Sequence, residues 1–171
     1  SEIINNLPLA TMSPEVTENR EGFIHVTDMI GNSSEMKIKF ILRDFELKGL
    51  DEKKELLKSL CKKIQKNEPR AKIIISFRRQ YRNMRYWLDK NQIPLAIAEK
   101  ALFNKNIQSI KKPIRGGTDG SLLTENGVPT PNIFTGMQNV HGPLEWISTT
   151  DMSLAAEVML EIIKLYSNLE N

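Results

Sequence analysis

The sequence contains little cysteine, few aromatic residues and little net charge. Of its 171 residues one is a cysteine and 6% are aromatic, and 24 basic against 21 acidic side chains leave a net charge of +3. A charge this small does not require nucleic acid or anionic lipid as a partner. No apolar run approaches the ~20 residues that span a bilayer, so we expect no membrane partner.

A secretion signal is also missing from the start of the sequence. The first residues have neither a basic n-region nor an apolar h-region, so we expect a cytoplasmic protein. The single cysteine, Cys61, lies among leucines and isoleucines at helical spacing. We predict that it is a buried small hydrophobe rather than a nucleophile.

The common signatures of zinc hydrolases and phosphate loops are absent. The sequence has no His-x-Asp, no His-Glu-x-x-His and no adjacent glutamates. His25 fits a core position inside a strand, and if His141 binds a metal, the other ligands lie on another segment. The loop Arg115–Gly120 lacks the Walker lysine, and we expect no helix directly after it. A tight corner in which Asp119 bonds backbone amides explains this loop equally well.

Alternation of apolar and polar residues predicts a small α+β unit in the first half of the chain. Residues 21–30 and 36–42 are predicted to form a hairpin around a polar turn. Residues 50–65 place apolar side chains at helical spacing with lysines on the other face. The isoleucine-rich residues 72–76 predict a third strand. A hairpin, a helix and a strand make a helix-on-sheet unit.

A change of pattern indicates a second region. Pro94 suits the first turn of a helix over residues 94–102, so we place a boundary between residues 85 and 93. Short strands are expected at residues 112–114 and 132–135, on either side of the glycine-rich loop.

The C-terminal residues predict an amphipathic helix opened by Thr149 or Thr150. The apolar stripe of this helix contains Met152, Ala155, Ala156, Met159, Ile163 and Tyr166.

Arginines and aromatic residues are interleaved over residues 78–87. Three interpretations stay open from the residues alone. The cluster could bind single-stranded nucleic acid, it could be the solvated end of a strand, or one or two of its arginines could capture an anion. Asn83 and Arg85 are two apart, so on an extended chain they would point the same way and could hold a carboxylate together.

Seven short motifs occur along the chain. They are Pro-Glu-x-Thr-Glu from Pro14, Glu-Gly-Phe-x-His from Glu21, Arg-Asp-Phe from Arg43, Tyr-x-Asn-Met-Arg from Tyr81, Lys-Pro-Ile-Arg-Gly-Gly-Thr-Asp-Gly from Lys112, Gly-Val-Pro-Thr-Pro-Asn-Ile-Phe-Thr-Gly from Gly127 and His-Gly-x-x-Glu-Trp from His141. Together they resemble the C-terminal part of the peptidase T family of bacterial zinc aminotripeptidases, and the resemblance covers nearly the whole chain.

The resemblance implies two parts. Residues 1–86 would be an α+β lid domain, an antiparallel sheet with helices on one face, that also forms homodimers. Residues 87–171 would be the incomplete C-terminal portion of an α/β zinc-peptidase catalytic domain. The missing N-terminal catalytic half would be a partner, and nucleic acid would not.

The resemblance also implies which residues meet metal and substrate. The family uses two zinc ions and a glutamate as general base, and His141 resembles the last zinc ligand, so no catalytic residue is expected in this chain. Asn83, Arg85 and Arg115 resemble groups that hold the carboxylate and carbonyl oxygens of short peptides.

The backbone of Gly117 and Thr118 would line the same cleft. On this reading the chain is part of a tripeptide aminopeptidase and is inactive alone. The alternative is a non-catalytic module for peptide-carboxylate binding or dimerisation.

Overall fold

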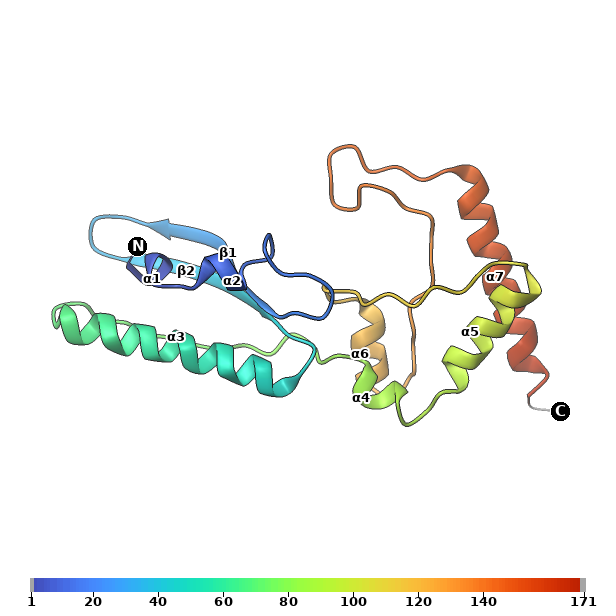
Figure 1. Ribbon diagram of the computed structural model, residues 1–171, viewed down its shortest axis with the longest axis horizontal. Coiled ribbons are helices and arrows are strands. Elements are labelled where there is room, and N and C mark those ends of the chain that lie inside the picture. The colour runs from blue at the N-terminus through green and yellow to red at the C-terminus, as the bar shows by residue number, and fades with distance from the viewer. Residues whose placement is uncertain (1, 170–171) are drawn as a thin grey trace. The chain divides into compact units, whose positions relative to one another are not determined.

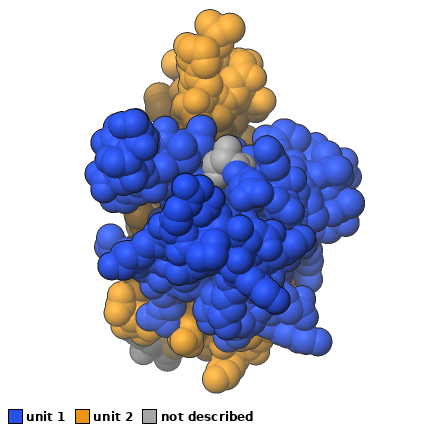
Figure 2. All heavy atoms as spheres, turned by 90° about the vertical axis from the view of Figure 1, so that its left-hand side faces the viewer, with its two compact units in different colours: residues 1–80, 113–117 blue, residues 81–112, 118–171 orange. Residues whose placement is uncertain are grey.

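The computed structural model describes residues 2–169 and divides the chain into two compact units. Unit 1 comprises residues 1–80 and 113–117, and unit 2 comprises residues 81–112 and 118–171 (Figure 2). In the described part of the chain, no helix is both long enough and apolar enough to cross a membrane.

Unit 1 is built on a β-hairpin. β1 (Phe23–Gly31) pairs antiparallel with β2 (Met36–Arg43), which confirms the predicted hairpin (Figure 1). In the turn, the side-chain oxygen of Asn32 accepts hydrogen bonds from the backbone N–H groups of Ser34 and Glu35, at 2.8 and 3.0 Å. Asparagine closes turns in this way because its side chain replaces a backbone acceptor.

A long helix runs beside the hairpin in unit 1 (Figure 1). α3 (Leu47–Asn67) confirms the helix predicted over residues 50–65. Two single turns, α1 (Glu2–Asn5) and α2 (Leu9–Met12), contact α3 and β1 respectively. The buried core and the side chains packed against it are Leu7, Ile24, Leu57, Leu9, Met12, Val26, Phe40, Leu42, Leu56 and Leu60. Each fully buried side chain of this size contributes about 1.5–3 kcal/mol.

A buried ion pair joins the end of β2 to α3. Lys53 Nζ lies 2.6 Å from Asp44 Oδ2, and only 9% and 13% of the two side chains are exposed. The Asp44 carboxylate also accepts a hydrogen bond from the backbone N–H of Glu46 at 2.9 Å. Gly22 and Gly49 leave room for this carboxylate, because a Cβ on either glycine would collide with Asp44.

The prediction of a third strand in unit 1, over residues 72–76, is wrong. The predictions of short strands at residues 112–114 and 132–135 are wrong as well. In the part of the chain that the structure describes, the sheet therefore has two strands rather than three. β-Branched side chains favour a pleated surface only where a neighbouring strand supplies hydrogen bonds and packing. Within residues 2–169 no strand pairs with residues 72–76, and Ile74 is 81% exposed.

Unit 2 contains, within the described residues, the helices α4 (Arg85–Leu88), α5 (Ile93–Asn104), α6 (Asp119–Glu125) and α7 (Thr149–Ser167). α5 confirms the helix predicted over residues 94–102. α6 begins at Asp119, at the end of the glycine-rich loop, so the expectation that no helix follows directly is wrong. Its buried side is made partly by Gly120, Ser121 and Thr124, and such small or polar residues do not produce an apolar periodicity.

α5 and α7 pack against each other (Figure 1). Ala101 on α5 and Val158 on α7 are both 0% exposed, and an ion pair of 3.0 Å joins Lys105 Nζ to Glu157 Oε2.

The apolar stripe predicted for α7 is only partly correct. Ala155 is buried, but Met152, Met159, Ile163 and Tyr166 are exposed by 53%, 49%, 64% and 40%. α7 carries more apolar surface than α5 alone covers.

The start of α7 is fixed by a reciprocal cap. The backbone N–H of Asp151 donates to Ser148 Oγ at 3.0 Å, and the Ser148 hydroxyl donates to Asp151 Oδ2 at 2.7 Å. The N-cap is thus Ser148, whereas the sequence predicted Thr149 or Thr150. Gly136 passes close by with φ +87°, and a Cβ there would collide with Asp151. Glycine is required at this position by both the backbone angle and the lack of space.

Candidate functional site

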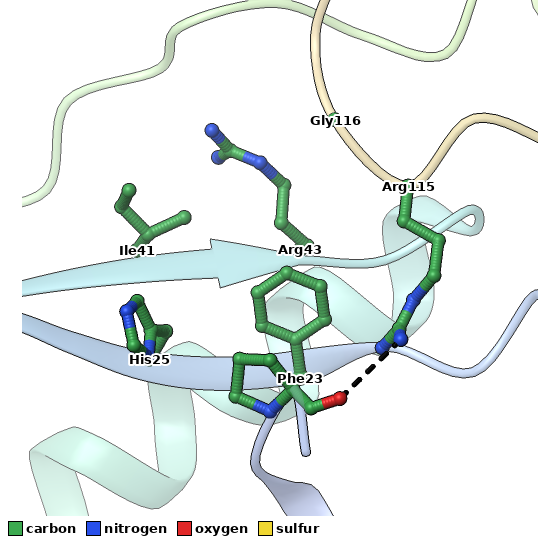
Figure 3. Close-up of a pocket in the computed structure, with 7 residues that line it drawn as sticks. Phe23, His25, Ile41, Arg43, Arg115 and Gly116 are labelled. Atoms are coloured by element: carbon green, nitrogen blue, oxygen red, sulfur yellow. Dashed lines mark hydrogen bonds between the residues drawn. The ribbon is translucent and has the colours of Figure 1, made fainter. Parts of the chain in front are cut away.

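The outer face of the hairpin carries a pocket of about 410 Å³ that lies within unit 1 (Figure 3). Side chains alternate along a strand, so the residues next to the buried Ile24 face away from the core. Phe23 and His25 of β1, with Ile41 and Arg43 of β2, form the floor of the pocket. The pocket therefore combines an apolar floor with basic groups.

Arg115 completes the pocket from the 113–117 segment. Its Nη1 and Nη2 donate hydrogen bonds to the carbonyl oxygen and the hydroxyl of Thr17, each at 2.5 Å. Nη1 is also 3.5 Å from the carbonyl oxygen of Pro14, and the guanidinium lies 4.9 Å from the centre of the Phe23 ring (Figure 3). Within the described residues, Arg115 Nε is buried and has no hydrogen-bond partner.

The charge of the pocket favours an anion. Three of its lining side chains, His25, Arg43 and Arg115, are basic or can become so, and none is acidic. Glu15 lies nearby: the Ser13 hydroxyl lowers the pKa of this carboxyl group, and the charge of His25 acts weakly in the same direction. His25 is half-buried and lines the pocket, so the prediction of a core histidine is wrong.

Asn83 and Arg85 lie in unit 2 at the start of α4. The predicted extended geometry is wrong, because Met84 between them is helical, with φ −61° and ψ −18°. Residues two apart on a helical turn do not face each other. The structure nevertheless joins the two, since Asn83 Oδ1 accepts a hydrogen bond from the backbone N–H of Arg85 at 3.0 Å. The Arg85 guanidinium lies 3.7 Å from Asp89 and 5.8 Å from the centre of the Tyr86 ring.

Gly117 and Thr118 follow Arg115 and fall in different units. Gly117 is exposed and belongs to unit 1. Thr118 occupies the N-cap position of α6, but its side chain makes no capping hydrogen bond, and within the described residues its buried hydroxyl has no partner. That both residues line a substrate cleft stays a prediction.

His141 lies in an exposed loop of unit 2. Its backbone has a φ of 67°, a left-handed angle that is uncommon for residues other than glycine. The Glu145 carboxylate supports this turn by accepting a hydrogen bond from the His141 backbone N–H at 2.9 Å.

The described residues do not form a zinc site by themselves. Among residues 2–169, no three side chains of histidine, cysteine, aspartate or glutamate lie together so as to hold a metal ion. A hydrolytic zinc ion needs three protein ligands, so this donor set does not fit the two ions that the resemblance implies. His141 stays a single predicted ligand.

Cys61 is buried on the inner face of α3, as predicted, and burial raises the pKa of its thiol. A raised pKa disfavours the thiolate, which is the nucleophilic form.

The residues that hold Arg115 were not singled out from the sequence. Thr17 and Phe23 occur in motifs that carry the family resemblance, but neither residue type has an obvious chemical role by itself. In the structure, Phe23 is next to the buried Ile24 in β1, so its side chain faces away from the core. Its contact with Arg115 depends on the chain returning to the hairpin about a hundred residues later.

Comparison with known proteins gives relatives that share one name. No family model matches the chain. A protein named peptidase T from Clostridium perfringens is 40% identical over 166 residues, which cover 97% of this chain and 41% of the relative. Another peptidase T, from a Geobacillus strain, is 41% identical over 157 residues, 92% of this chain and 38% of the relative.

A solved structure shows the same fold. The aminopeptidase PepT from Bacillus cereus matches 95% of this chain and 43% of its own, with a TM-score of 0.61 and 14% identity. The α+β arrangement followed by a C-terminal portion of a larger enzyme fold is therefore confirmed at the level of fold. The chain spans about two fifths of the length of the curated relatives that it matches.

Proposed function

Since the chain is homologous to proteins named peptidase T over nearly its whole length, we propose that it is the C-terminal part of a zinc-dependent aminopeptidase that releases the N-terminal residue of tripeptides. The observation that carries this proposal is the 40% identity over 97% of the chain. The names of the peptidase T relatives support a peptidase activity. The zinc dependence, the tripeptide substrate and the cytoplasmic location are proposed from the family resemblance.

The proposal assigns roles to six residues. His141 would be one zinc ligand, supplied to a site whose other ligands and general base lie outside this chain. Asn83, Arg85 and Arg115 would hold the oxygens of a short peptide. The basic side chains and the fixed guanidinium of Arg115 suit this role, because an arginine fork binds a carboxylate through two parallel hydrogen bonds. The backbone of Gly117 and Thr118 would line the substrate path.

The experiment compares the chain alone with the chain recombined with its missing part. The purified chain should not hydrolyse trialanine. Coexpression with the portion of the Clostridium perfringens relative that the chain does not match should give zinc-dependent hydrolysis that a chelator abolishes. Hydrolysis by the chain alone, abolished by a chelator, would show that the catalytic apparatus is present here and would contradict the proposal.

A second candidate, a non-catalytic module that binds peptide carboxylates, is favoured by the basic pocket within unit 1. Titration of trialanine against the wild type and Arg115→Ala tests the pocket, and Arg85→Ala tests the predicted clamp, with Arg82→Ala as the control. Equal binding by the wild type and Arg115→Ala would count against the pocket, and equal binding by the wild type and Arg85→Ala would count against the clamp. We expect analytical sedimentation of the chain to show a homodimer. We expect a titration with single-stranded DNA at low salt to show no binding.

A further inference from the structure

Arg115 is held from two sides in unit 1. Thr17 supplies two acceptors to the two terminal nitrogens, and the Phe23 ring supplies an aromatic face 4.9 Å away. Each contact suits a cation, because hydrogen bonds to a charged donor are stronger than neutral ones and a ring face attracts a guanidinium.

Among the described residues, these contacts leave Nε of the guanidinium without an acceptor. A guanidinium has five N–H donors in a rigid fork. Thr17 occupies the end that is formed by Nη1 and Nη2, and Nη1 also lies 3.5 Å from the carbonyl oxygen of Pro14. The donors of the side edge that begins at Nε are not used by these contacts. Nε is buried and has no partner among the described residues, and a buried donor without an acceptor is costly. An anion at this side edge would satisfy it.

We infer that Thr17 and Phe23 are positioning residues, which hold Arg115 with its side edge directed at the carboxylate of a short peptide. The inference rests on the proposed function, in which Arg115 binds that carboxylate. Thr17 contacts the arginine and not the ligand, so it acts through Arg115. The apolar floor beside it, made by Phe23 and Ile41, suits the side chain of the same peptide.

The hydroxyl of Thr17 is oriented by its own hydrogen bond. It donates to the carbonyl oxygen of Ser13 at 2.7 Å, which leaves the lone pairs of the oxygen for Arg115. Thr17 is 5% exposed, so water does not readily replace a lost contact. Serine keeps this hydroxyl, whereas valine keeps the shape and removes it.

The experiment measures how well the chain distinguishes a free carboxylate from an amide. Calorimetric titration of the 171-residue chain with trialanine and with trialanine amide gives an affinity ratio for each variant. The wild type should prefer the acid. Thr17→Val should lower the ratio about tenfold, as expected for a charged hydrogen bond, with little change for the amide.

Two variants serve as controls for Thr17→Val. Thr17→Ser should keep the wild-type ratio within about threefold, because it retains the acceptor. Thr11→Val removes an exposed hydroxyl that donates to the carbonyl oxygen of Pro8 at 3.3 Å, and it should change nothing. Phe23→Leu should lower the ratio about threefold through the lost ring face.

A second measurement keeps the inference testable if Thr17→Val does not fold. The Nε–Hε resonance of Arg115 in the wild type should shift on addition of trialanine and not of its amide. An unchanged affinity ratio in Thr17→Val, no preference for the acid in the wild type, or no shift of this resonance would each overturn the inference. Selective acid binding without hydrolysis in the recombined protein would instead reject the proposed enzyme and keep the positioning role.

Discussion

The two units differ in how they bury their apolar side chains. In unit 1, Ile24 and Leu57 are 1% and 2% exposed, and helix and hairpin share one core. In unit 2, the pairing of α5 with α7 buries mainly small residues, and Leu160 and Ile163 of α7 are 59% and 64% exposed. A sheet and a helix that cover each other are sufficient for a core, whereas two helices leave the far face of each one open.

This contrast bears on how the chain is expected to behave. Large exposed apolar patches mark surfaces that bind another segment or protein. The chain spans about two fifths of its curated relatives, so we expect unit 2 to require further polypeptide and unit 1 to be more stable. Four substitutions test the contrast.

The largest effect is expected from the core of unit 1. Leu57→Ala should destabilise unit 1 by about 3–4 kcal/mol, because it removes buried methyl groups and leaves a cavity. Leu160→Ala in α7 is the matched control and should cost far less, since Leu160 is 59% exposed. Urea unfolding followed by circular dichroism measures both. Equal losses would mean that the two units do not differ in burial.

The buried ion pair should have the next largest effect. Lys53→Met leaves the Asp44 carboxylate buried without its partner, and we expect a loss of about 3 kcal/mol. Lys54→Met is the control, because Lys54 pairs with Asp51 on the surface of the same helix, with 40% and 69% of the side chains exposed; exposed pairs contribute about 0–1 kcal/mol. Similar unfolding midpoints for the two variants would contradict the role of the pair.

A smaller effect is expected in unit 2, at the cap of α7. Ser148→Ala removes the acceptor of the Asp151 N–H and should cost about 1 kcal/mol. Ser153→Ala, at an exposed position within the same helix, is the control. Hydrogen exchange of the first turn of α7 should accelerate in Ser148→Ala only, and unit 1 should keep its protection.

The smallest effect concerns pH. Lys39 donates a hydrogen bond to Asp28 across the hairpin at 2.7 Å, and this bond lowers the pKa of that carboxyl group. A lowered folded-state pKa stabilises the fold above the unfolded-state pKa, and the stabilisation is lost as the pH falls through the folded-state value. Asp28→Asn should therefore be slightly less stable than the wild type at neutral pH, and the difference should vanish in acid.

Thermal unfolding across a pH series measures the Asp28 effect. Lys39→Gln is the reciprocal variant, and the double variant should cost no more than the larger single loss. A stability gap that widens in acid would contradict the stated sign.

Local patterns were sufficient for elements whose partners are close in sequence. The alternation around the Asn32 turn predicted the hairpin, and the spacing that includes Leu57 and Cys61 predicted α3, because each pattern matches the period of its own backbone. Predictions from sequence patterns were wrong where a segment lacked a partner strand or began an irregular turn. Residues 72–76 have strand-forming side chains, but among the described residues no strand pairs with them. Asn83 and Arg85 start a helical turn that their spacing did not reveal.

The candidate site also has features that the sequence predicts and features that only the fold creates. The sequence by itself determined the chemistry available: one histidine in a glycine and proline loop, an arginine before two glycines, and motifs that resemble one peptidase family. The tertiary structure decided that Arg115 meets Thr17, 98 residues away in the sequence, and stacks on Phe23. Residue spacing specifies a helix or a strand, but only the folded chain brings distant residues together.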